Sequence, residues 1–147
     1  MIIRVQEEDF DIADVNRQLL AGRSDVGAVC SFIGLVRDLP ANRLKTMSLE
    51  HYPGMTEKSL QKIVEVAGQR WEILDCTIIH RIGDLKPADQ IVLVSVLSAH
   101  RKAAFRACEF IMDYLKTDAP FWKKETGEQG EKWVEAKESD SDARKQW

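Results

Sequence analysis

The chain of 147 residues has few of the features that mark a disulfide framework, a metal site or a membrane span. It contains three cysteines, Cys30, Cys76 and Cys108, and none of them forms a CxxC pair. Three cysteines cannot all pair and each lies in an apolar segment, so we expect buried, reduced thiols without a chemical role. The three histidines are scattered along the chain, and no metal site is expected. No apolar run approaches the roughly 18 to 20 residues of a transmembrane helix.

Familiar catalytic motifs are also missing. The sequence has no glycine-rich phosphate loop, no HExxH and no GxSxG. Its first residues lack the basic and apolar regions of a signal peptide, so we expect a cytoplasmic protein. The formal net charge of −3 argues against a general nucleic-acid binder, although it leaves room for a local anion site. We expect no membrane association and no permanently bound cofactor.

The composition is that of a globular protein, with 44% hydrophobic and 31% charged residues. The length predicts one domain over residues 1–147. Helical and strand patterns alternate, which predicts an α+β fold whose sheet is covered by two principal helices. The strands are expected at 1–6, 27–36, 46–52, 76–82, 91–97 and 132–137. The helices are expected at 10–20, after an N-cap at Thr56, and between Ser98 and Asp118, and the polar loops at 37–45, 84–90 and 126–131.

The third predicted helix has basic residues at both ends, in a chain that is acidic as a whole. Phe105, Cys108, Met112 and Leu115 recur at three- and four-residue spacing, which predicts one buried helical face. Pro120 breaks the pattern shortly after the helix.

His100 and Arg101 follow a buried strand and open this helix. Backbone N–H groups at a helix N-terminus, together with an arginine fork, favour binding of an anion or phosphate. The alternative is a solvated first turn, in which basic groups oppose the helix dipole at a cost of about 0.3–1 kcal/mol.

Lys116 lies at the end of the helix, where a cation interacts favourably with the helix dipole. This structural role alone is enough to explain a lysine at that position. Lys123 and Lys124 follow an aromatic pair that we expect to anchor the backbone. Two adjacent ammonium groups beside an apolar wall would lower each other's pKa, which produces a usable base or nucleophile; the alternative is a solvated surface pair. Arg37 ends a buried strand, a frequent position for binding residues.

These residues predict one anion pocket, built from Arg37, His100, Arg101, Lys116 and the pair Lys123–Lys124. The reaction does not follow from these residue types alone.

The motifs of the chain resemble one family, the large, catalytic subunit of molybdopterin synthase. The resembling segments, in chain order, are FIGLVRD at 32–38, LEHYPGMTEKSL at 49–60, IIHRIGDLKPAD at 78–89, SAHR at 98–101, FIMDYLKTDAPFWKKE at 110–125 and WVEAKESD at 133–140. Together they span nearly the whole chain.

The resemblance implies conversion of cyclic pyranopterin monophosphate to molybdopterin by insertion of two sulfurs. The sulfur would arrive as a thiocarboxylate on the C-terminal glycine of a small ubiquitin-like subunit. The family assembles as a central homodimer of large subunits with a small subunit at each outer end, a heterotetramer. Its fold, an α/β hammerhead with an added β-rich portion, agrees with the α+β prediction.

The resemblance also implies roles for individual residues. Lys116 and Lys123 match the family's catalytic pocket lysines. The implied substrate-binding residues are Leu35, Val36, Arg37, His100, Arg101, Lys116, Lys123, Lys124, Glu125 and Lys137. Of these, Arg37, His100 and Arg101 are the implied anchors of the substrate phosphate, from the same chain or from the neighbouring protomer. Lys137 stands where the family often has arginine, and a lysine provides a point charge instead of a bidentate fork.

Two alternatives to an enzyme follow from the same residues. One is a non-catalytic module that binds the tail of a ubiquitin-like protein. The other is a binder of an anionic, nucleotide-like ligand, for which binding would depend steeply on salt.

Overall fold

The structure is a computed structural model, which describes residues 1–38, 44–128, 130–134 and 137–147. Helices and strands are mixed along the chain, which confirms the predicted α+β class. The elements in chain order are β1 (Ile2–Gln6), α1 (Ile12–Leu20), β2 (Ala28–Leu35), β3 (Leu44–His51), α2 (Met55–Arg70), β4 (Asp75–Arg81), β5 (Gly83–Leu85), β6 (Gln90–Ser98), α3 (Arg101–Asp118), β7 (Phe121–Gly127), β8 (Gly130–Val134) and α4 (Glu138–Arg144).

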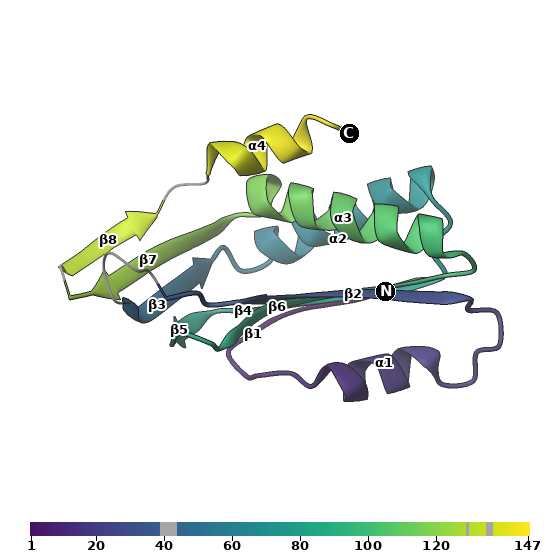
Figure 1. Ribbon diagram of the computed structural model, residues 1–147, viewed down its shortest axis with the longest axis horizontal. Helices are drawn as coiled ribbons and strands as arrows, with labels where there is room; N and C mark the ends of the chain where they lie inside the picture. Colours follow the sequence, from purple (N-terminus) through teal and green to yellow (C-terminus); the bar gives the residue numbers. More distant parts are fainter. Residues whose placement is uncertain (39–43, 129, 135–136) are drawn as a thin grey trace.

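The first sheet has the strand order β1-β4-β6-β2. β1 and β4 are parallel, and the other two pairs are antiparallel. Helices α2 and α3 cover one face of this sheet and α1 lies on the other (Figure 1). The central strands β4 and β6 are therefore covered on both sides, which explains why each has a run of consecutive buried residues in place of an alternating pattern.

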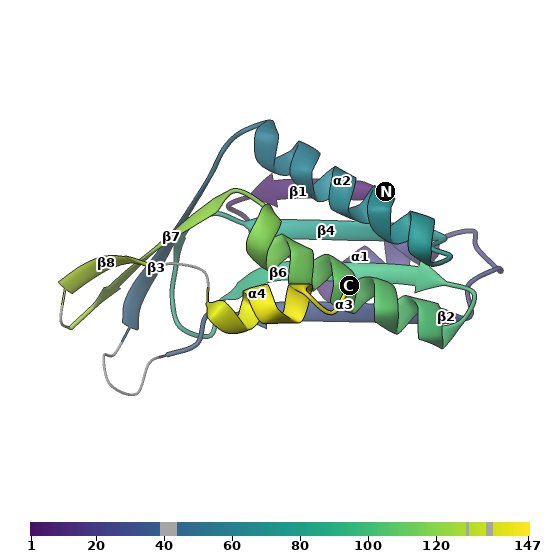
Figure 2. The same cartoon turned by 90° about the horizontal axis from the view of Figure 1, so that it is seen from above.

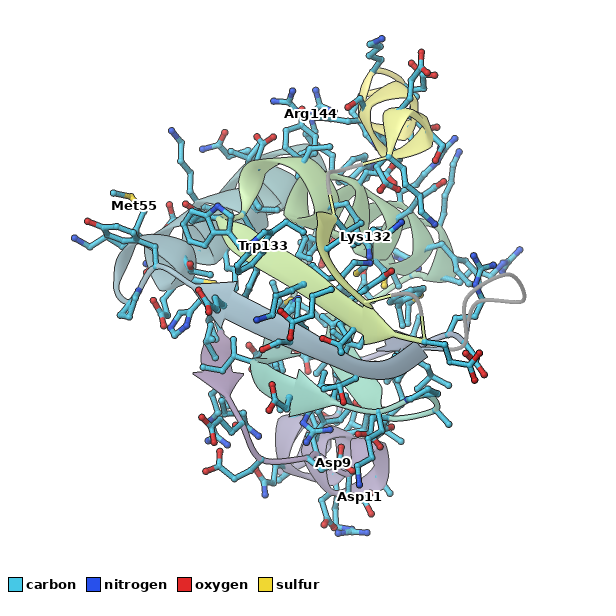
Figure 3. All side chains as sticks on the ribbon, turned by 90° about the vertical axis from the view of Figure 1, so that its left-hand side faces the viewer. Asp9, Asp11, Met55, Lys132, Trp133 and Arg144 are labelled. Atoms are coloured by element: carbon cyan, nitrogen blue, oxygen red, sulfur yellow. The ribbon has the colours of Figure 1, made fainter. Side chains whose placement is uncertain are left out.

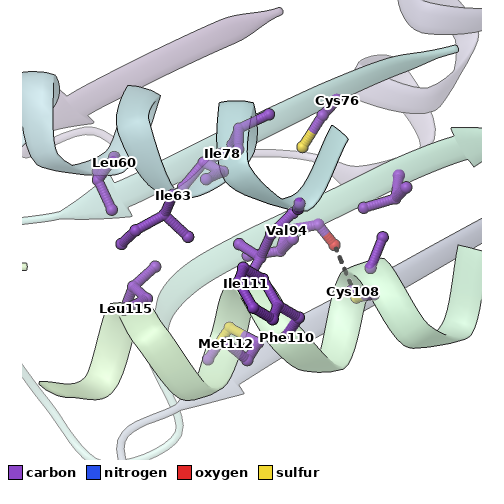
Figure 4. Close-up of a cluster of buried hydrophobic side chains, with 14 of the residues drawn as sticks. Leu60, Ile63, Cys76, Ile78, Val94, Cys108, Phe110, Ile111, Met112 and Leu115 are labelled. Carbon is purple, nitrogen blue, oxygen red and sulfur yellow. Dashed lines mark hydrogen bonds between the residues drawn. The ribbon is translucent and has the colours of Figure 1, made fainter. Parts of the chain in front are cut away.

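The main core lies between this sheet and the two helices α2 and α3, which run side by side above it (Figure 2). Apolar side chains from both helices meet those of β4 and β6, as Figure 4 shows for Leu60, Ile78, Val94 and Ile111. Each such side chain contributes about 1.5–3 kcal/mol when it is fully removed from water.

The predicted buried face of α3 was wrong at Phe105, whose residue surface is 63% exposed. The buried residues of α3 are centred on Ala104, Cys108, Ile111 and Leu115. Phe105 lies about 100° around the helix from Ala104, beyond the edge of this stripe.

The second sheet is wholly antiparallel, in the order β5-β3-β7-β8. The chain enters it from β4 through Gly83, whose φ of 80° is one that glycine adopts without strain. The sheet extends from one end of the molecule (Figure 1) and corresponds to the added β-rich portion implied by the resemblance. Residues 121–125 were not predicted as a strand, and the predicted loop at 126–131 was wrong, because β7 and β8 form a hairpin through most of it.

Other boundaries, and one further helix, also differ from the predictions. Gly54, not Thr56, is the N-cap of α2, and the Thr56 hydroxyl instead accepts from Tyr52 N (3.1 Å) and donates to Pro120 O (2.9 Å). The charged tail contains the short helix α4, which lies along α3 on the outside of the molecule (Figures 1 and 2). β3 begins within the predicted loop at 37–45, and β8 ends before the predicted 137; residues 39–43 and 135–136 lie outside the described residues.

Figure 3 places these parts relative to one another in an end-on view. α4, which carries Arg144, lies on one side of the sheets, and Asp9 and Asp11, just before α1, lie on the other. Lys132 and Trp133 of β8 lie between them. The end of α3, the second sheet and α4 thus converge at one end of the molecule.

Candidate active site

A cavity of about 240 Å³ lies where the end of α3 meets the second sheet and α4. Its wall is apolar on the side of the sheets, and charged groups project into it from α3, β7 and the segment around α4. The lining residues are Met47, Leu49, His80, Ile91, Leu115, Lys116, Ala119, Phe121, Lys123, Val134, Lys137 and Asp140.

Lys116 extends from the last turn of α3 into this cavity. Burial of its amine is the main cause of a pKa below the usual lysine range, and the nearby charges of Lys123 and Lys137 lower that pKa further. Asp140 acts in the opposite direction. Lys116 therefore has a larger fraction of neutral amine near neutral pH than a surface lysine has, which suits an exchange of protons with a ligand.

Lys123 reaches the cavity because of the alternation of β7. Phe121, Lys123 and Glu125 share one face of the strand, and Lys123 Nζ lies 3.6 Å from Glu125 Oε1. Glu125 is itself buried beside the cavity wall. A buried carboxylate paired with Lys123 fixes the position of that ammonium group.

Lys124 lies on the opposite face of β7, away from the described cavity lining. Its Nζ is 3.8 Å from Glu131 Oε2 and 5.7 Å from the ring centre of Trp133. The predicted mutual effect of adjacent Lys123 and Lys124 was wrong, because neighbouring residues of a strand point to opposite faces. The ammonium group that faces Lys123 is Lys116, seven positions earlier in the sequence.

His80 is a lining residue that the sequence reasoning missed. Its ring stacks on Phe121 with centroids 3.7 Å apart, and its Nδ1 lies 2.8 Å from Arg81 O. Burial lowers the pKa of His80 to about 4, so the ring is neutral at pH 7. Nδ1–H then donates to the carbonyl and leaves Nε2 as an acceptor. The available signal was a histidine that directly follows the apolar pair Ile78–Ile79 in a predicted strand.

The three predicted residues at the end of β2 are near this end of the molecule. β2 ends beside the start of β6, where Leu35 pairs with Gln90. Val36 is buried against Met47 and Leu49, which line the cavity. Both backbone groups of Val36 bond to the 88–89 turn, so they are not available to a ligand. Leu35 and Arg37 are exposed beside it.

His100 and Arg101 lie at the other end of α3, in a recess that also contains Lys102 and Phe105. Fifteen residues separate Arg101 from Lys116, about 22 Å along the helix axis. The prediction of one pocket containing both groups was therefore wrong for a single chain.

The cysteines do not line the cavity. Cys76 and Cys108 are buried and Cys30 is half-buried, in the core under α3. Burial raises the pKa of Cys76 to about 12 and also raises the pKa of Cys108. Cys108 Sγ faces Val94 O at 4.0 Å (Figure 4). Thiols held in this protonated form are poor nucleophiles.

The described residues contain neither a cluster of metal ligands nor a membrane-spanning helix. No group of three or more His, Cys, Asp or Glu side chains there could hold a metal ion. In the same part of the chain, no helix is long and apolar enough to span a membrane.

The chain is similar to proteins of one family. The sequence model of the family described as "MoaE protein" matches residues 5–118. The molybdopterin synthase catalytic subunit of Ralstonia nicotianae is 58% identical over 146 residues, which cover 99% of this chain and 83% of the relative.

Solved structures show the same fold. The molybdopterin biosynthesis MoaE protein from Burkholderia ambifaria superposes with a TM-score of 0.86 at 51% identity, covering 99% of this chain and 97% of that one. A complex of subunits 1 and 2 of molybdopterin-converting factor from Helicobacter pylori contains a chain with a TM-score of 0.74. Its identity is 22%, with coverage of 94% of this chain and 92% of that chain, and this likeness shows the fold alone.

Proposed function

We propose, because the chain belongs to the MoaE protein family, that it is the catalytic subunit of a molybdopterin synthase, an enzyme of molybdenum cofactor biosynthesis. The proposed reaction converts cyclic pyranopterin monophosphate to molybdopterin by transfer of two sulfurs. A small ubiquitin-like partner supplies each sulfur from its C-terminal glycine thiocarboxylate. The observation that carries this proposal is that Lys116 and Lys123 line one cavity, in which the amine of Lys116 is desolvated although the residue as a whole is exposed.

The cavity chemistry supports a role for both lysines. Lys123 is held by Glu125 and attracts the anionic thiocarboxylate. Lys116, with its lowered pKa, exchanges protons as the sulfur attacks the pterin side chain. Each attack joins sulfur to a side-chain carbon as a thioester and breaks a carbon–oxygen bond at that carbon. For one sulfur the displaced oxygen is an ester oxygen of the cyclic phosphodiester, which opens to a monoester; for the other it is a hydroxyl, which takes up a proton and leaves as water. A further water then cleaves each acyl–sulfur bond, leaving the sulfur on the pterin and the glycine as a carboxylate. The neutral His80 provides an acceptor in the wall.

The phosphate site requires a second copy of the chain. His100 and Arg101 are the proposed phosphate anchors, and in one chain they are about 22 Å from Lys116 along α3. The proposed homodimer resolves this separation, since a partner copy could supply these residues. With a small subunit on each large one, the assembly would be a heterotetramer.

The edge of the first sheet supports such a dimer. In the described part of the chain β2 is an edge strand, and Val29, Phe32 and Phe105 on or beside it are 39%, 41% and 63% exposed. Two copies related by a two-fold axis would align their β2 strands in antiparallel order. The start of the partner's β2, next to its His100–Arg101 segment, would then lie beside Arg37 of the first chain.

A reconstitution tests the proposal. The chain is mixed with thiocarboxylated small subunit and cyclic pyranopterin monophosphate, and the dithiolene product is assayed. We expect product without any added metal or bound cofactor, since substrate and partner supply all reacting atoms. Binding of the small subunit without product would instead indicate the non-catalytic module. We place the protein in the cytoplasm. The same assay should therefore detect product in the cytoplasmic fraction of cells.

A further inference from the structure

Two lining residues of the cavity, Lys137 and Asp140, come neither from the two sheets nor from the end of α3. They lie on residues 137–147, the anchor segment, which contains α4. Their position therefore depends on how this segment is held against the rest of the molecule.

Trp147 fixes one end of the anchor segment. Its ring contacts Trp71 and Phe110 edge-on, with centroids 5.5 and 5.6 Å apart. Its indole Nε1 donates to Asp113 Oδ2 at 2.7 Å, and its main-chain oxygen accepts from Arg70 at 2.7 Å. An aromatic residue whose indole N–H and main-chain oxygen are both hydrogen-bonded is a firm attachment.

Arg144 provides a second attachment, nearer the cavity. Its guanidinium donates to Asp118 Oδ2 at 3.1 Å and lies 4.8 Å from the ring centre of Tyr114. Both partners belong to α3, the helix that carries Lys116. The anchor segment, which supplies one wall of the cavity, is thus attached to the same helix that carries Lys116.

The charges around Lys116 come from every element packed on it. β7 contributes Lys123 with its partner Glu125, β4 contributes the neutral His80, and the anchor segment contributes Lys137 and Asp140. Among the described lining residues, Asp140 is the only carboxylate. It is the group that offsets the repulsion between the lysines.

We propose that Asp140 is a positioning residue of the reaction, held over the cavity by the Trp147 anchor so that its carboxylate keeps part of Lys116 in the ammonium form. This rests on the proposed function, in which Lys116 gives and takes protons. Without Asp140, the remaining carboxylate near the cavity is Glu125, which pairs with Lys123. The amine of Lys116 would then lose its proton too readily to act as an acid.

Asp140→Asn tests the inference without substrate. The pKa of Lys116 is measured in the full chain by NMR, with carbon-13 at the lysine ε position and the signal assigned by its loss in Lys116→Arg. We expect the pKa to fall further in Asp140→Asn. Asp142→Asn is the matched control, since Asp142 lies on the same helix but pairs with Lys145 at 3.0 Å in solvent, and we expect no change there. Equal pKa values in the two variants would overturn the inference.

Trp147 tests the anchor separately. Trp147→Ala should shift the pKa of Lys116, because a loosened α4 moves Asp140 and Lys137 and changes the burial of the amine, while Trp147→Phe keeps the ring contacts and should have a smaller effect. If Trp147→Ala does not fold, Arg144→Gln, which removes the bond to Asp118, replaces it. An unchanged Lys116 pKa in a folded anchor variant contradicts the anchor. Failure of the proposed function would appear elsewhere, as normal product formation by Lys116→Ala.

Discussion

Lys123 and Lys124 are adjacent in the sequence, but their side chains lie on opposite faces of β7. Lys123 faces the cavity beside Glu125, whereas Lys124 pairs with Glu131 and lies against Trp133. The strand thus separates two residues to which the family resemblance gave related roles. Only Lys123 is in a position to meet a ligand that also contacts Lys116.

This separation predicts different effects of two similar substitutions. Lys123→Ala should reduce dithiolene formation by about 10²- to 10⁴-fold, the usual contribution of a group that orients or moves a proton. Lys124→Ala should stay within about threefold of the unmodified chain, as expected for an exposed ion pair. Single-turnover product formation and small-subunit affinity are measured for both. Equal losses of turnover would mean that the cavity is not where sulfur is transferred.

The stacked His80 predicts a pH dependence of stability. Its folded-state pKa of about 4 lies below the ordinary value of 6.5, so between those pH values the unfolded chain binds the additional proton. Stability is therefore lost as the pH falls from 6.5 to 4, by about 3 kcal/mol from this group. Urea unfolding across this range should show a shallower loss for His80→Gln than for the exposed His100→Gln. Parallel curves for the two variants would rule out a buried, neutral His80.

The buried thiols predict that sulfur transfer does not use cysteine. A chain with Cys30→Ala, Cys76→Ala and Cys108→Ala should retain turnover, because Cys76 and Cys108 stay protonated in the core and none of the three lines the described cavity. We expect only a loss of stability of about 1–3 kcal/mol from the vacated volume. Turnover is compared after circular dichroism shows a folded chain. A folded but inactive triple variant would contradict this assignment.

Gly27 predicts a steric effect at the edge of the first sheet. A Cβ at this position would lie 2.0 Å from Ala99 O, a contact that requires the backbone to move. Gly27→Ala should destabilise the chain by about 1–3 kcal/mol. Gly68 is the control, because nothing lies within 4 Å of an added Cβ there and alanine in a helix is favoured by about 1 kcal/mol. Thermal unfolding should shift in opposite directions for the two variants.

The principal helices were predictable from the spacing of their apolar residues, and the central strands from short runs of apolar residues. Both patterns arise because these residues are buried. The sequence reasoning missed α4, since that segment is held by Trp147 and Arg144 against distant residues and has no apolar stripe of its own. The error at Phe105 arose at the edge of a helical stripe, where sequence spacing alone does not distinguish a buried side chain from an exposed one.

Only part of the site could be predicted from the sequence, because some of its residues meet only through tertiary packing. Lys116 and Lys123 were identified by residue type and resemblance, and the structure brings them together. His80 and Asp140 were missed, since their contact with the cavity depends on tertiary packing between elements far apart in the sequence. Arg101 was placed in the same pocket as Lys116, although the length of α3 separates the two in one chain.

In the proposed dimer, one reaction site combines Lys116 of one chain with Arg101 of its partner. Lys116→Ala and Arg101→Ala chains, each inactive alone, are mixed, allowed to exchange subunits and assayed with thiocarboxylated small subunit. In a mixed dimer one site has both residues intact, so random assembly should restore about a quarter of the unmodified activity. If both residues act within one chain, no site is intact and the mixture stays inactive, which would contradict a site shared between two chains.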